Sequence, residues 1–193
     1  MSRIKEIQRI DPIPEDKFGY DKFVTKSAGD AEKVKKEKED FQGTEFLWSE
    51  SKNGKMVRII AYDGNEPIGY LALKKFRDAW KVYTIGVRPM ARGKGIASKL
   101  YDFAISKTKL YSDTMETPAM RKLWTKIYKN YDISGLDINT GKTFDIEAKG
   151  DELVSKDPNI DLYSDKDDGI FLVIQKGLRE SRWLKLAGLK KIF

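Results

Sequence analysis

One segment constrains the fold more than any other: a predicted strand, a turn rich in glycine and basic residues, and an amphipathic helix. The pattern of Ala79 to Val87 predicts the strand, and the residues from Gly95 to Lys107 repeat apolar side chains at helical spacing. Glycine lets a backbone approach a ligand closely, and the N–H groups of a first helical turn point at negative charge. The segment therefore predicts an anion site where the strand meets the helix.

The predicted anion site combines backbone N–H groups from the start of the helix with two basic side chains. Its residues are Arg92, Gly93, Lys94, Gly95, Ile96 and Ala97. Two common phosphate-binding patterns do not fit, because the segment lacks a Gly-Lys-Ser/Thr sequence and a third glycine at the dinucleotide-binding offset. The site is thus predicted to bind an anion without being a P-loop or a dinucleotide fingerprint.

Hairpins and short strands surround this segment. Two apolar runs, Met56 to Tyr62 and Pro67 to Phe76, are separated by Asp63-Gly64-Asn65, which is a strong hairpin signal. The predicted N-terminal elements are a strand at Arg3 to Ile10, an irregular stretch at Ile13 to Lys26, and a charged helix at Ala31 to Phe41, capped by Asp30 and ended by Gly43. The predicted C-terminal elements are a strand at Leu110-Tyr111, a helix from Thr117-Pro118 to Lys129, a hairpin of Tyr131 to Ile138 with Thr143 to Ala148, a loop at 149–168, and a strand at Gly169 to Gln175.

The composition excludes several kinds of chemistry. The 193 residues suit one domain, and they include no cysteine and no histidine. Disulfides, thiolate metal sites and a cysteine nucleophile are therefore excluded, and a zinc site or a serine–histidine hydrolase is disfavoured. We expect no metal. No apolar run approaches the roughly 20 residues that span a bilayer, and residues 1–15 contain no signal-peptide core, so we expect a cytoplasmic protein.

The positive charge is concentrated at the C-terminus. The chain has 37 basic and 30 acidic residues, a net charge of +7, and five basic residues against one acidic residue in 177–193 account for +4 of it. This distribution disfavours a nucleic-acid-binding core. As a helix, the tail 177–193 would be basic and amphipathic. Three interpretations are open: the helix packs on its own domain, it docks on a partner protein or, the least favoured, it lies on a membrane.

The segment Val87 to Ala97 resembles the acyl-CoA-binding signature of the GNAT superfamily of N-acetyltransferases, V-x-P-x-x-(R/Q)-G-x-G-x-(G/A), at every fixed position. The resemblance covers residues 56 to 130 and, by position, Gly169 to Gln175. It implies an α+β (three-layer α/β) fold: a mixed, mostly antiparallel sheet with a splayed central strand pair, flanked by helices. It also implies acetyl-CoA as co-substrate, with Ile85 and Val87 offering backbone groups to the pantetheine arm.

The helix after the site departs from the family pattern N-x-x-A-x-x-L-Y, because residues 117–124 read TPAMRKLW. By the resemblance, Thr117 and Trp124 occupy positions that contact the cofactor. The family tyrosine that protonates the leaving thiolate is replaced by Trp124, whose indole N–H is too weak an acid. Tyr128, one turn later, and Tyr111 are the candidate replacements.

The candidate general base also differs from the family. Where members often place a glutamate, near Lys81, this chain has lysine. The nearest polar alternatives are Tyr83, Thr84 and Asp113. Asp113, just after the strand at Leu110-Tyr111, is preferred, and it also suits a turn or a helix cap. Transfer through a water chain or by positioning alone does not require a carboxylate.

Two functions follow from these residues. The first is transfer of an acetyl group from acetyl-CoA to an amine of a small molecule or a protein, by direct attack. The second is a catalytically weak or inert GNAT-like structural or interaction protein; a faint similarity to acetyltransferase-like proteins of tailed phages favours it and implies a virion-associated location. In either case we expect one domain at 1–176, with an insertion at about 131–168, followed by the tail.

Overall fold

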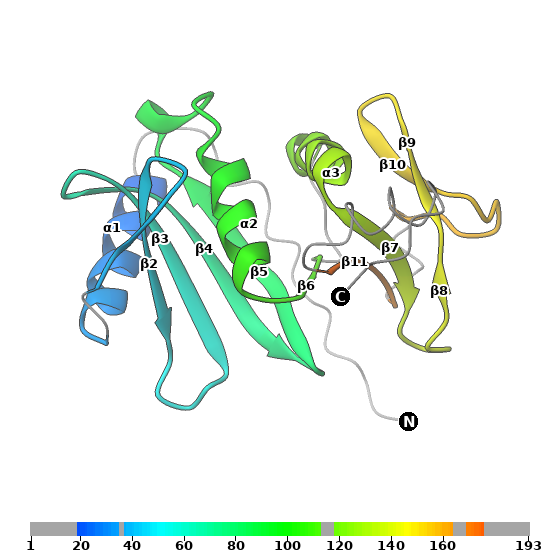
Figure 1. Cartoon of the computed structure of the whole chain (residues 1–193), viewed down its shortest axis with the longest axis horizontal. Helices are drawn as coiled ribbons and strands as arrows, with labels where there is room; N and C mark the ends of the chain where they lie inside the picture. Colours follow the sequence, from blue (N-terminus) through cyan, green and yellow to red (C-terminus); the bar gives the residue numbers. More distant parts are fainter. Residues whose placement is uncertain (1–18, 35–36, 113–117, 164–168, 176–193) are drawn as a thin grey trace, which may run out of the picture.

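The computed structural model describes residues 19–34, 37–112, 118–163 and 169–175. Within them, a nine-stranded sheet is accompanied by helices and by a separate two-stranded hairpin (Figure 1). The helices are α1 (Gly19–Glu32), η1 (Pro89–Ala91), α2 (Ile96–Lys107) and α3 (Pro118–Asn130). The strands of the sheet are β1 (Glu39–Phe41), β2 (Thr44–Glu50), β3 (Met56–Asp63), β4 (Glu66–Phe76), β5 (Ala79–Val87), β6 (Leu110–Tyr111), β7 (Asp132–Asp137), β8 (Thr143–Phe144) and β11 (Ile170–Gln175), and the hairpin consists of β9 (Ile146–Lys149) and β10 (Glu152–Ser155).

The sheet is antiparallel except at one junction. Its strand order is β1-β2-β3-β4-β5-β6-β11-β7-β8, and among the described strands only β5 and β6 are parallel neighbours. They pair at two positions, Trp80 with Leu110 and Lys81 with Tyr111. The sheet therefore consists of two antiparallel halves joined by this short parallel pair, which we call the seam.

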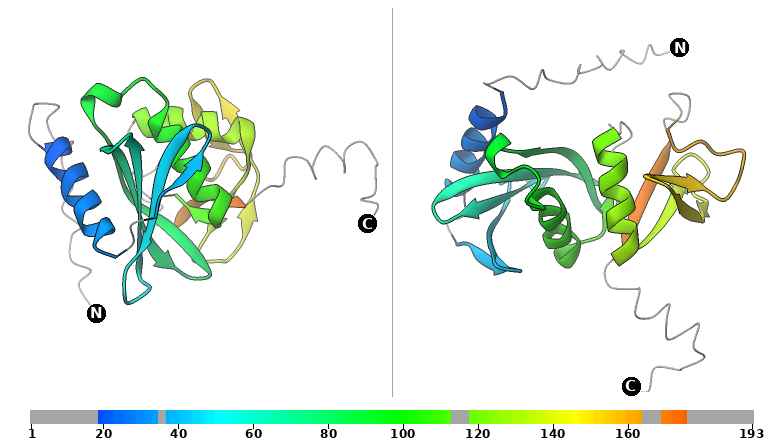
Figure 2. Two further views of the ribbon diagram at one scale, coloured as in Figure 1. Left: turned by 60° about the vertical axis from the view of Figure 1, so that its left-hand side comes forward. Right: turned by 90° about the horizontal axis from the view of Figure 1, so that it is seen from above.

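The helices α1 and α2 cover opposite faces of the first half-sheet, which we call the α1 face and the α2 face (Figure 2). On the α1 face a buried cluster is formed by Val24, Ala28, Ala31, Leu47, Ile60, Tyr62, Tyr70 and Ala72. On the α2 face the main core includes Phe46, Ile59, Leu71, Ile96, Leu100 and Phe103. Because successive strand residues point to opposite faces, the neighbours Tyr70 and Leu71 of β4 belong to different clusters.

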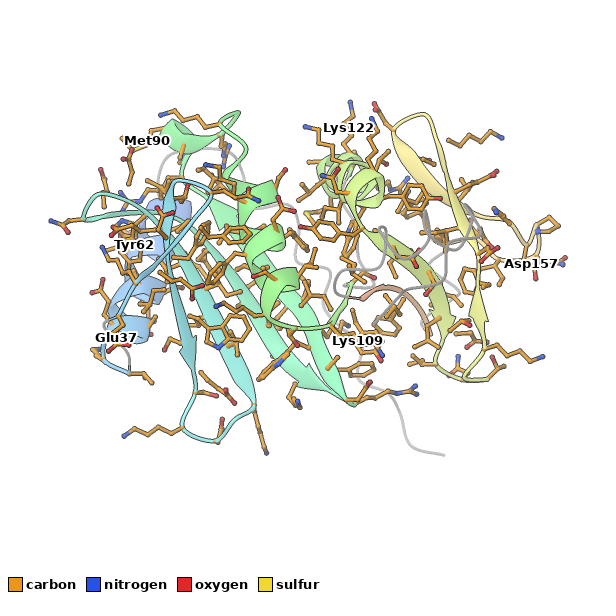
Figure 3. All side chains as sticks on the ribbon, in the orientation of Figure 1. Glu37, Tyr62, Met90, Lys109, Lys122 and Asp157 are labelled. Atoms are coloured by element: carbon orange, nitrogen blue, oxygen red, sulfur yellow. The ribbon has the colours of Figure 1, made fainter. Side chains whose placement is uncertain are left out.

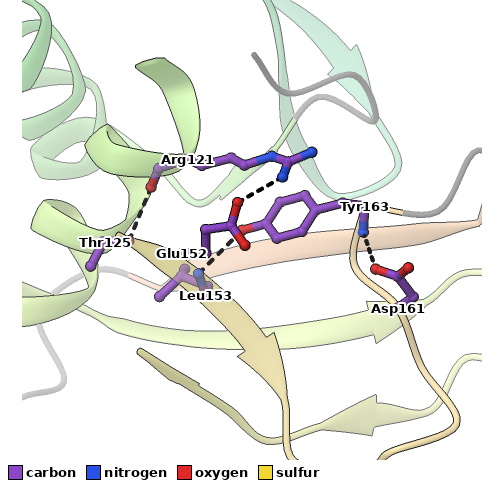
Figure 4. A network of polar contacts seen from close by, with 6 residues as sticks. All are labelled: Arg121, Thr125, Glu152, Leu153, Asp161 and Tyr163. Atoms are coloured by element: carbon purple, nitrogen blue, oxygen red, sulfur yellow. Dashed lines mark hydrogen bonds and ion pairs between the residues drawn. The ribbon is translucent and has the colours of Figure 1, made fainter. Parts of the chain in front are cut away.

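Polar contacts attach the β9–β10 hairpin to α3 (Figure 4). Arg121 donates a hydrogen bond of 2.7 Å to Glu152, and its guanidinium lies 3.9 Å from the centre of the Tyr163 ring. The Tyr163 hydroxyl accepts a 3.2 Å hydrogen bond from the N–H of Leu153. These contacts hold the hairpin and the following segment against the helix.

The predicted position of the helix in the N-terminal third was wrong. The helix is α1, which starts at Gly19 inside the stretch predicted to be irregular, and Glu39–Phe41 form β1 instead of the end of a helix. The reason is burial: Val24, Ala28 and Ala31 recur on one helical face, whereas the charged run after them offers no apolar face. β1 pairs with β2 across Gln42 and Gly43, whose φ angles of 53° and 70° suit a tight hairpin turn.

The central predictions are confirmed. The hairpin of β3 and β4, the strand β5, the helix α2, the short β6 and the last strand β11 lie where the sequence placed them. The predicted second hairpin is shorter than expected, because β8 pairs with β7 only up to Phe144. The rest of the predicted strand forms β9, which pairs with β10, a strand inside the predicted loop 149–168. The predicted strand Arg3 to Ile10 and the tail 177–193 lie outside the described residues.

Candidate functional site

The turn between β5 and α2 has the backbone conformation of an anion cradle. Gly93 and Gly95 have φ angles of 76° and 78°, in the left-handed region that favours glycine. A Cβ added at either residue would meet no atom within 4 Å, so both glycines leave open space beside the backbone. Gly95 is the N-cap of α2, and no side chain caps this end of the helix. Its first-turn N–H groups therefore face a position suited to an anion.

Positive charge surrounds this turn. Arg92 and Lys94 are exposed, and Arg92 Nε donates a 3.4 Å hydrogen bond to the carbonyl of Val87. Met90, 64% exposed, marks this end of the molecule in Figure 3, whereas Lys109 marks the opposite end of β5. The predicted anion-site residues are thus brought together at one end of β5.

Arg88 fixes the turn to the rest of the fold. Its N–H donates to the carbonyl of Ile68 at 2.9 Å, and its guanidinium pairs with Glu66 and donates to the Thr25 hydroxyl at 2.7 Å. The side chain is only 12% exposed. Sequence analysis missed this role, because Arg88 occupies a variable position of the signature and its partners come from β4 and α1.

The edge of β5 that faces away from β4 is paired only at the seam. Beyond Lys81, no described strand pairs with this edge, because Ser112 donates its N–H to the carbonyl of Leu172 in β11. The stretch from Val82 to Val87 therefore presents backbone groups leading toward the cradle. Ile85 and Val87, predicted to provide such groups, lie within it, with half-buried side chains packed against the α2-face core.

A β-bulge interrupts β5 midway along this edge. Ala72 of β4 pairs with Thr84, whereas the next residue, Leu73, pairs with Val82, so Tyr83 is the extra residue. A bulge re-aims backbone groups locally, and Tyr83 is left 50% exposed. No sequence signal marked the bulge, because register shifts depend on the partner strand.

The candidate acids already have hydrogen-bond acceptors within the fold. Tyr128 donates to the carbonyl of Ile146 at 3.1 Å, and the buried Tyr111 donates to Asp78 at 2.9 Å. Tyr111 pairs with Lys81, six residues before Val87, which is roughly 20 Å along a strand. The Tyr111 hydroxyl is therefore not brought to the glycine turn, and the Tyr128 hydroxyl is directed to β9.

Of the other predicted site residues, some are wholly or partly buried and some lie outside the described residues. Trp124 is 1% exposed and its ring lies 5.5 Å from that of Tyr101, between α3 and α2. Ile96 is buried under α2, and Ala97 is half-buried. Thr117 and Asp113 lie outside the described residues, so their predicted roles in cofactor binding and as a base stay predictions.

The pKa values of Asp78 and Asp102 are both shifted. A hydrogen bond from Lys109, with a second from Tyr111, lowers the pKa of Asp78 in the β4–β5 turn. Burial raises the pKa of Asp102 on α2, and a hydrogen bond from Tyr131 partly opposes this effect. Neither residue was singled out by sequence.

Within the described residues, no cluster of three metal-ligating side chains occurs. In that same part of the chain, none of the helices has the length and apolar character needed to cross a membrane.

Comparison with known proteins agrees with the motif. Residues 22–126 match the model of the acetyltransferase (GNAT) family, which is more than half of the chain. The protein belongs to the GNAT acetyltransferase family, and its mostly antiparallel mixed sheet with flanking helices is the fold expected for it.

Several solved structures are similar to this chain. A GNAT-family protein from Bacteroides thetaiotaomicron is 13% identical, with coverage of 86% of this chain and 89% of that one and a TM-score of 0.38. The PaiA N-acetyltransferase from Thermoplasma acidophilum, in complex with coenzyme A, is 14% identical over 65% and 63% of the two chains, with a TM-score of 0.35. An IAA acetyltransferase from Bacillus cereus is 15% identical over 64% and 79%, also with a TM-score of 0.35. No curated protein matches the chain.

Proposed function

We propose that this protein is an acyl-CoA-dependent N-acyltransferase that moves the acetyl group of acetyl-CoA to a primary amine by direct attack. The observation that carries the proposal is the uncapped N-terminus of α2, preceded by two left-handed glycines and two exposed basic side chains. Such a turn suits the pyrophosphate of coenzyme A, because it offers several convergent N–H groups and positive charge without a side chain in the way.

The residues of β5 would hold the rest of the co-substrate. The backbone edge from Val82 to Val87 leads from the seam to the cradle and can pair with the amides of a pantetheine arm. At the bulge, a re-aimed N–H near Tyr83 is suited to polarise the thioester carbonyl. The thioester supplies an activated acyl group. The amine nitrogen forms the new bond to the carbonyl carbon, the carbon–sulfur bond breaks, the amine loses one proton and the sulfur gains one.

The proton donor to the sulfur is proposed to be Tyr128 rather than Tyr111. Tyr111 lies at the seam and its hydroxyl donates to the carboxylate of Asp78. Tyr128 lies on α3 and its hydroxyl donates to a backbone carbonyl of β9. Thr117 is kept as a proposed contact of the co-substrate and Asp113 as the proposed base, whereas the buried Trp124 contributes packing between α2 and α3. Positioning of the two reactants supplies the remaining rate enhancement.

A catalytically weak or inert GNAT-like protein is the second candidate. The observation that favours it is the position of the two tyrosine hydroxyls, each of which donates a hydrogen bond within the fold. Such a protein would retain the cradle and lack a proton donor at the thioester sulfur. It would bind coenzyme A and transfer no acyl group.

Titration calorimetry with acetyl-CoA tests the cradle. The wild type is expected to bind with a Kd on the order of micromolar, and Gly93→Glu or Gly95→Glu to abolish binding, because each places a negative charge where the pyrophosphate lies. Gly141→Glu is the matched control, since Gly141 has a similar φ of 74°, open space around it and a position in the distant β7–β8 turn.

Thiol release with a panel of amines then separates the two candidates. Turnover that Tyr128→Phe reduces supports the enzyme, whereas binding of acetyl-CoA without thiol release from any amine favours the inert protein. Absence of acetyl-CoA binding by the wild type would contradict both.

A further inference from the structure

The bulge of β5 opens onto a surface of the α1 face that the proposed chemistry leaves unexplained. Next to the extra residue Tyr83, the Thr84 hydroxyl lies 3.1 Å from the Tyr70 hydroxyl. The ring of Phe23, from α1, lies 4.8 Å from that of Tyr70 and is 48% exposed. Two half-exposed aromatic side chains, Phe23 and Tyr83, thus lie beside a pair of hydroxyls at the point where backbone pairing is interrupted.

A lysine side chain adjoins this surface. Lys74 Nζ lies 3.4 Å from the centre of the Tyr83 ring. The next residue, Lys75, points to the opposite face, where its Nζ lies 5.0 Å from the ring of Trp80 in the α2-face core. Within the part of the chain that the structure describes, neither lysine forms an ion pair with a carboxylate. A ring face attracts an ammonium group without neutralising it. The positive charge of Lys74 therefore stays available to a ligand on this surface.

A hollow of about 640 Å³ extends the same surface toward the β2–β3 turn. It is lined by Ser51, Asn53, Lys55, Met56, Lys74 and Lys75. Lys55, like the other two lysines, has no ion pair among the described residues. Lys74 both lines the hollow and contacts the Tyr83 ring. It follows Ala72, at the bulge, by two residues, or about 7 Å along the strand.

We propose that the acceptor of the acyl transfer is a primary amine that carries an anionic group, a carboxylate or a phosphate, bound by Lys74 with Lys55. This inference rests on the proposed N-acyltransferase function and adds the chemical class of the second substrate. The amine lies at the bulge, the body of the molecule lies against Tyr83 and Phe23, and the anionic group lies toward the hollow. Two lysines without an ion pair beside the hollow repel a polyamine and attract an anion.

Matched acceptors test the charge requirement by thiol-release kinetics with acetyl-CoA. The first pair is 4-(2-aminoethyl)benzoate and phenethylamine, which share an aromatic ring and a primary amine and differ in one carboxylate. The second pair is O-phosphotyramine and tyramine, and spermidine serves as the polycation. The anionic member of at least one pair is expected to have a kcat/KM about tenfold higher, corresponding to one or two new charge contacts near the surface. The pair with the larger ratio identifies the carboxylate or the phosphate as the preferred group.

Charge reversal locates the selectivity. Lys74→Glu is expected to remove the preference for the anionic member while leaving the acetyl-CoA affinity unchanged. Lys52→Glu is the control, because Lys52 lies in the same turn, is exposed and does not line the hollow. Equal rates within both pairs, a preference for spermidine, or equal effects of the two substitutions would overturn the proposal.

Binding measurements keep the inference separate from the proposed chemistry. If no amine is turned over, calorimetry with 4-(2-aminoethyl)benzoate and O-phosphotyramine still tests the lysines. Binding of either compound by the wild type and by Lys52→Glu, with loss in Lys74→Glu, supports the anion site even for an inert protein. Absence of binding to the wild type contradicts it.

Discussion

The two ends of β5 are both positively charged, but they present the charge in different ways. At the cradle end, left-handed glycines and an uncapped helix direct backbone N–H groups at one position. At the lysine end, Lys74 and Lys75 lie over aromatic rings, and the hollow beside them is lined by flexible side chains. A backbone site has a fixed geometry, whereas a lysine site adapts to ligands of different shape.

This difference suggests a division of tasks along one strand. The co-substrate is the same in every turnover, so a rigid site that fits one pyrophosphate suits it. An acceptor site built from mobile ammonium groups selects the sign of a charge more than its exact position. Substitutions at the two ends are therefore expected to have separable effects on the two substrates.

The largest effect is expected from charge in the cradle. Gly93→Asp should weaken acetyl-CoA binding about 30-fold more than Gly93→Asn, because the two side chains tolerate the left-handed conformation similarly and differ in one negative charge. Calorimetry measures both affinities. Equal losses in the two variants would indicate that shape, and not charge, defines this end.

A smaller loss of acetyl-CoA affinity is expected when the glycine turn loses the contacts of Arg88. Arg88→Ala removes the contacts to Glu66 and Thr25, and should weaken acetyl-CoA binding about tenfold and lower the free energy of unfolding by about 2 kcal/mol. Calorimetry and denaturant unfolding check the two effects. The discrimination between phenethylamine and its carboxylate analogue should stay as in the wild type; a changed ratio would show that the two ends are coupled.

At the lysine end, Tyr83→Ala is expected to raise the KM for an aromatic acceptor about fivefold, because it removes an exposed ring beside the bulge. The Kd of acetyl-CoA should remain unchanged, since the backbone edge of β5 is retained. Steady-state kinetics with 4-(2-aminoethyl)benzoate and calorimetry with acetyl-CoA measure the two quantities. Weaker binding of acetyl-CoA would place the tyrosine ring in the co-substrate site instead.

The smallest effect concerns Asp78, beside the lysine end. Because the hydrogen bond from Lys109 lowers its pKa, the charged carboxylate stabilises the folded state above the ordinary pKa of aspartate, and this stability is lost as the pH falls through the lowered value. Asp78→Asn should therefore lower Tm by ~2 °C at pH 7, since the group is largely exposed, and by less near pH 3. Thermal unfolding at the two pH values decides; an unchanged Tm at pH 7 would show that the interaction is screened.

Sequence predicted the cradle end well, because its determinants are local. Left-handed glycines before an amphipathic helix leave a signature in consecutive residues, and Gly93 and Gly95 adopt the conformation that the pattern implies. The β3–β4 hairpin was equally predictable, because Gly64 lies between two apolar runs.

The lysine end left no comparable signature. Tyr83 becomes a bulge only through the register of β5 against β4, and Lys74 approaches it from the partner strand. Arg88 was missed for the same reason, since Thr25 is 63 residues away. The helix α1 was misplaced because its apolar residues are few, and the strands that bury them are distant in sequence. Contacts between separate elements decide these features, and short-range patterns do not encode them.

The seam of two residue pairs bears on how this chain can change during evolution. Long backbone ladders lock two strands in register, because a slip of one residue turns every side chain to the wrong face. Among the described residues, backbone pairing between the two half-sheets is limited to Trp80 with Leu110 and Lys81 with Tyr111, and apolar packing with a few side-chain hydrogen bonds, such as Tyr111 to Asp78, makes up the rest of their junction. Packing of this kind accepts different side chains of similar total volume. The second half-sheet and its β9–β10 hairpin are thus free to diversify, while β5 and the glycine turn stay as they are.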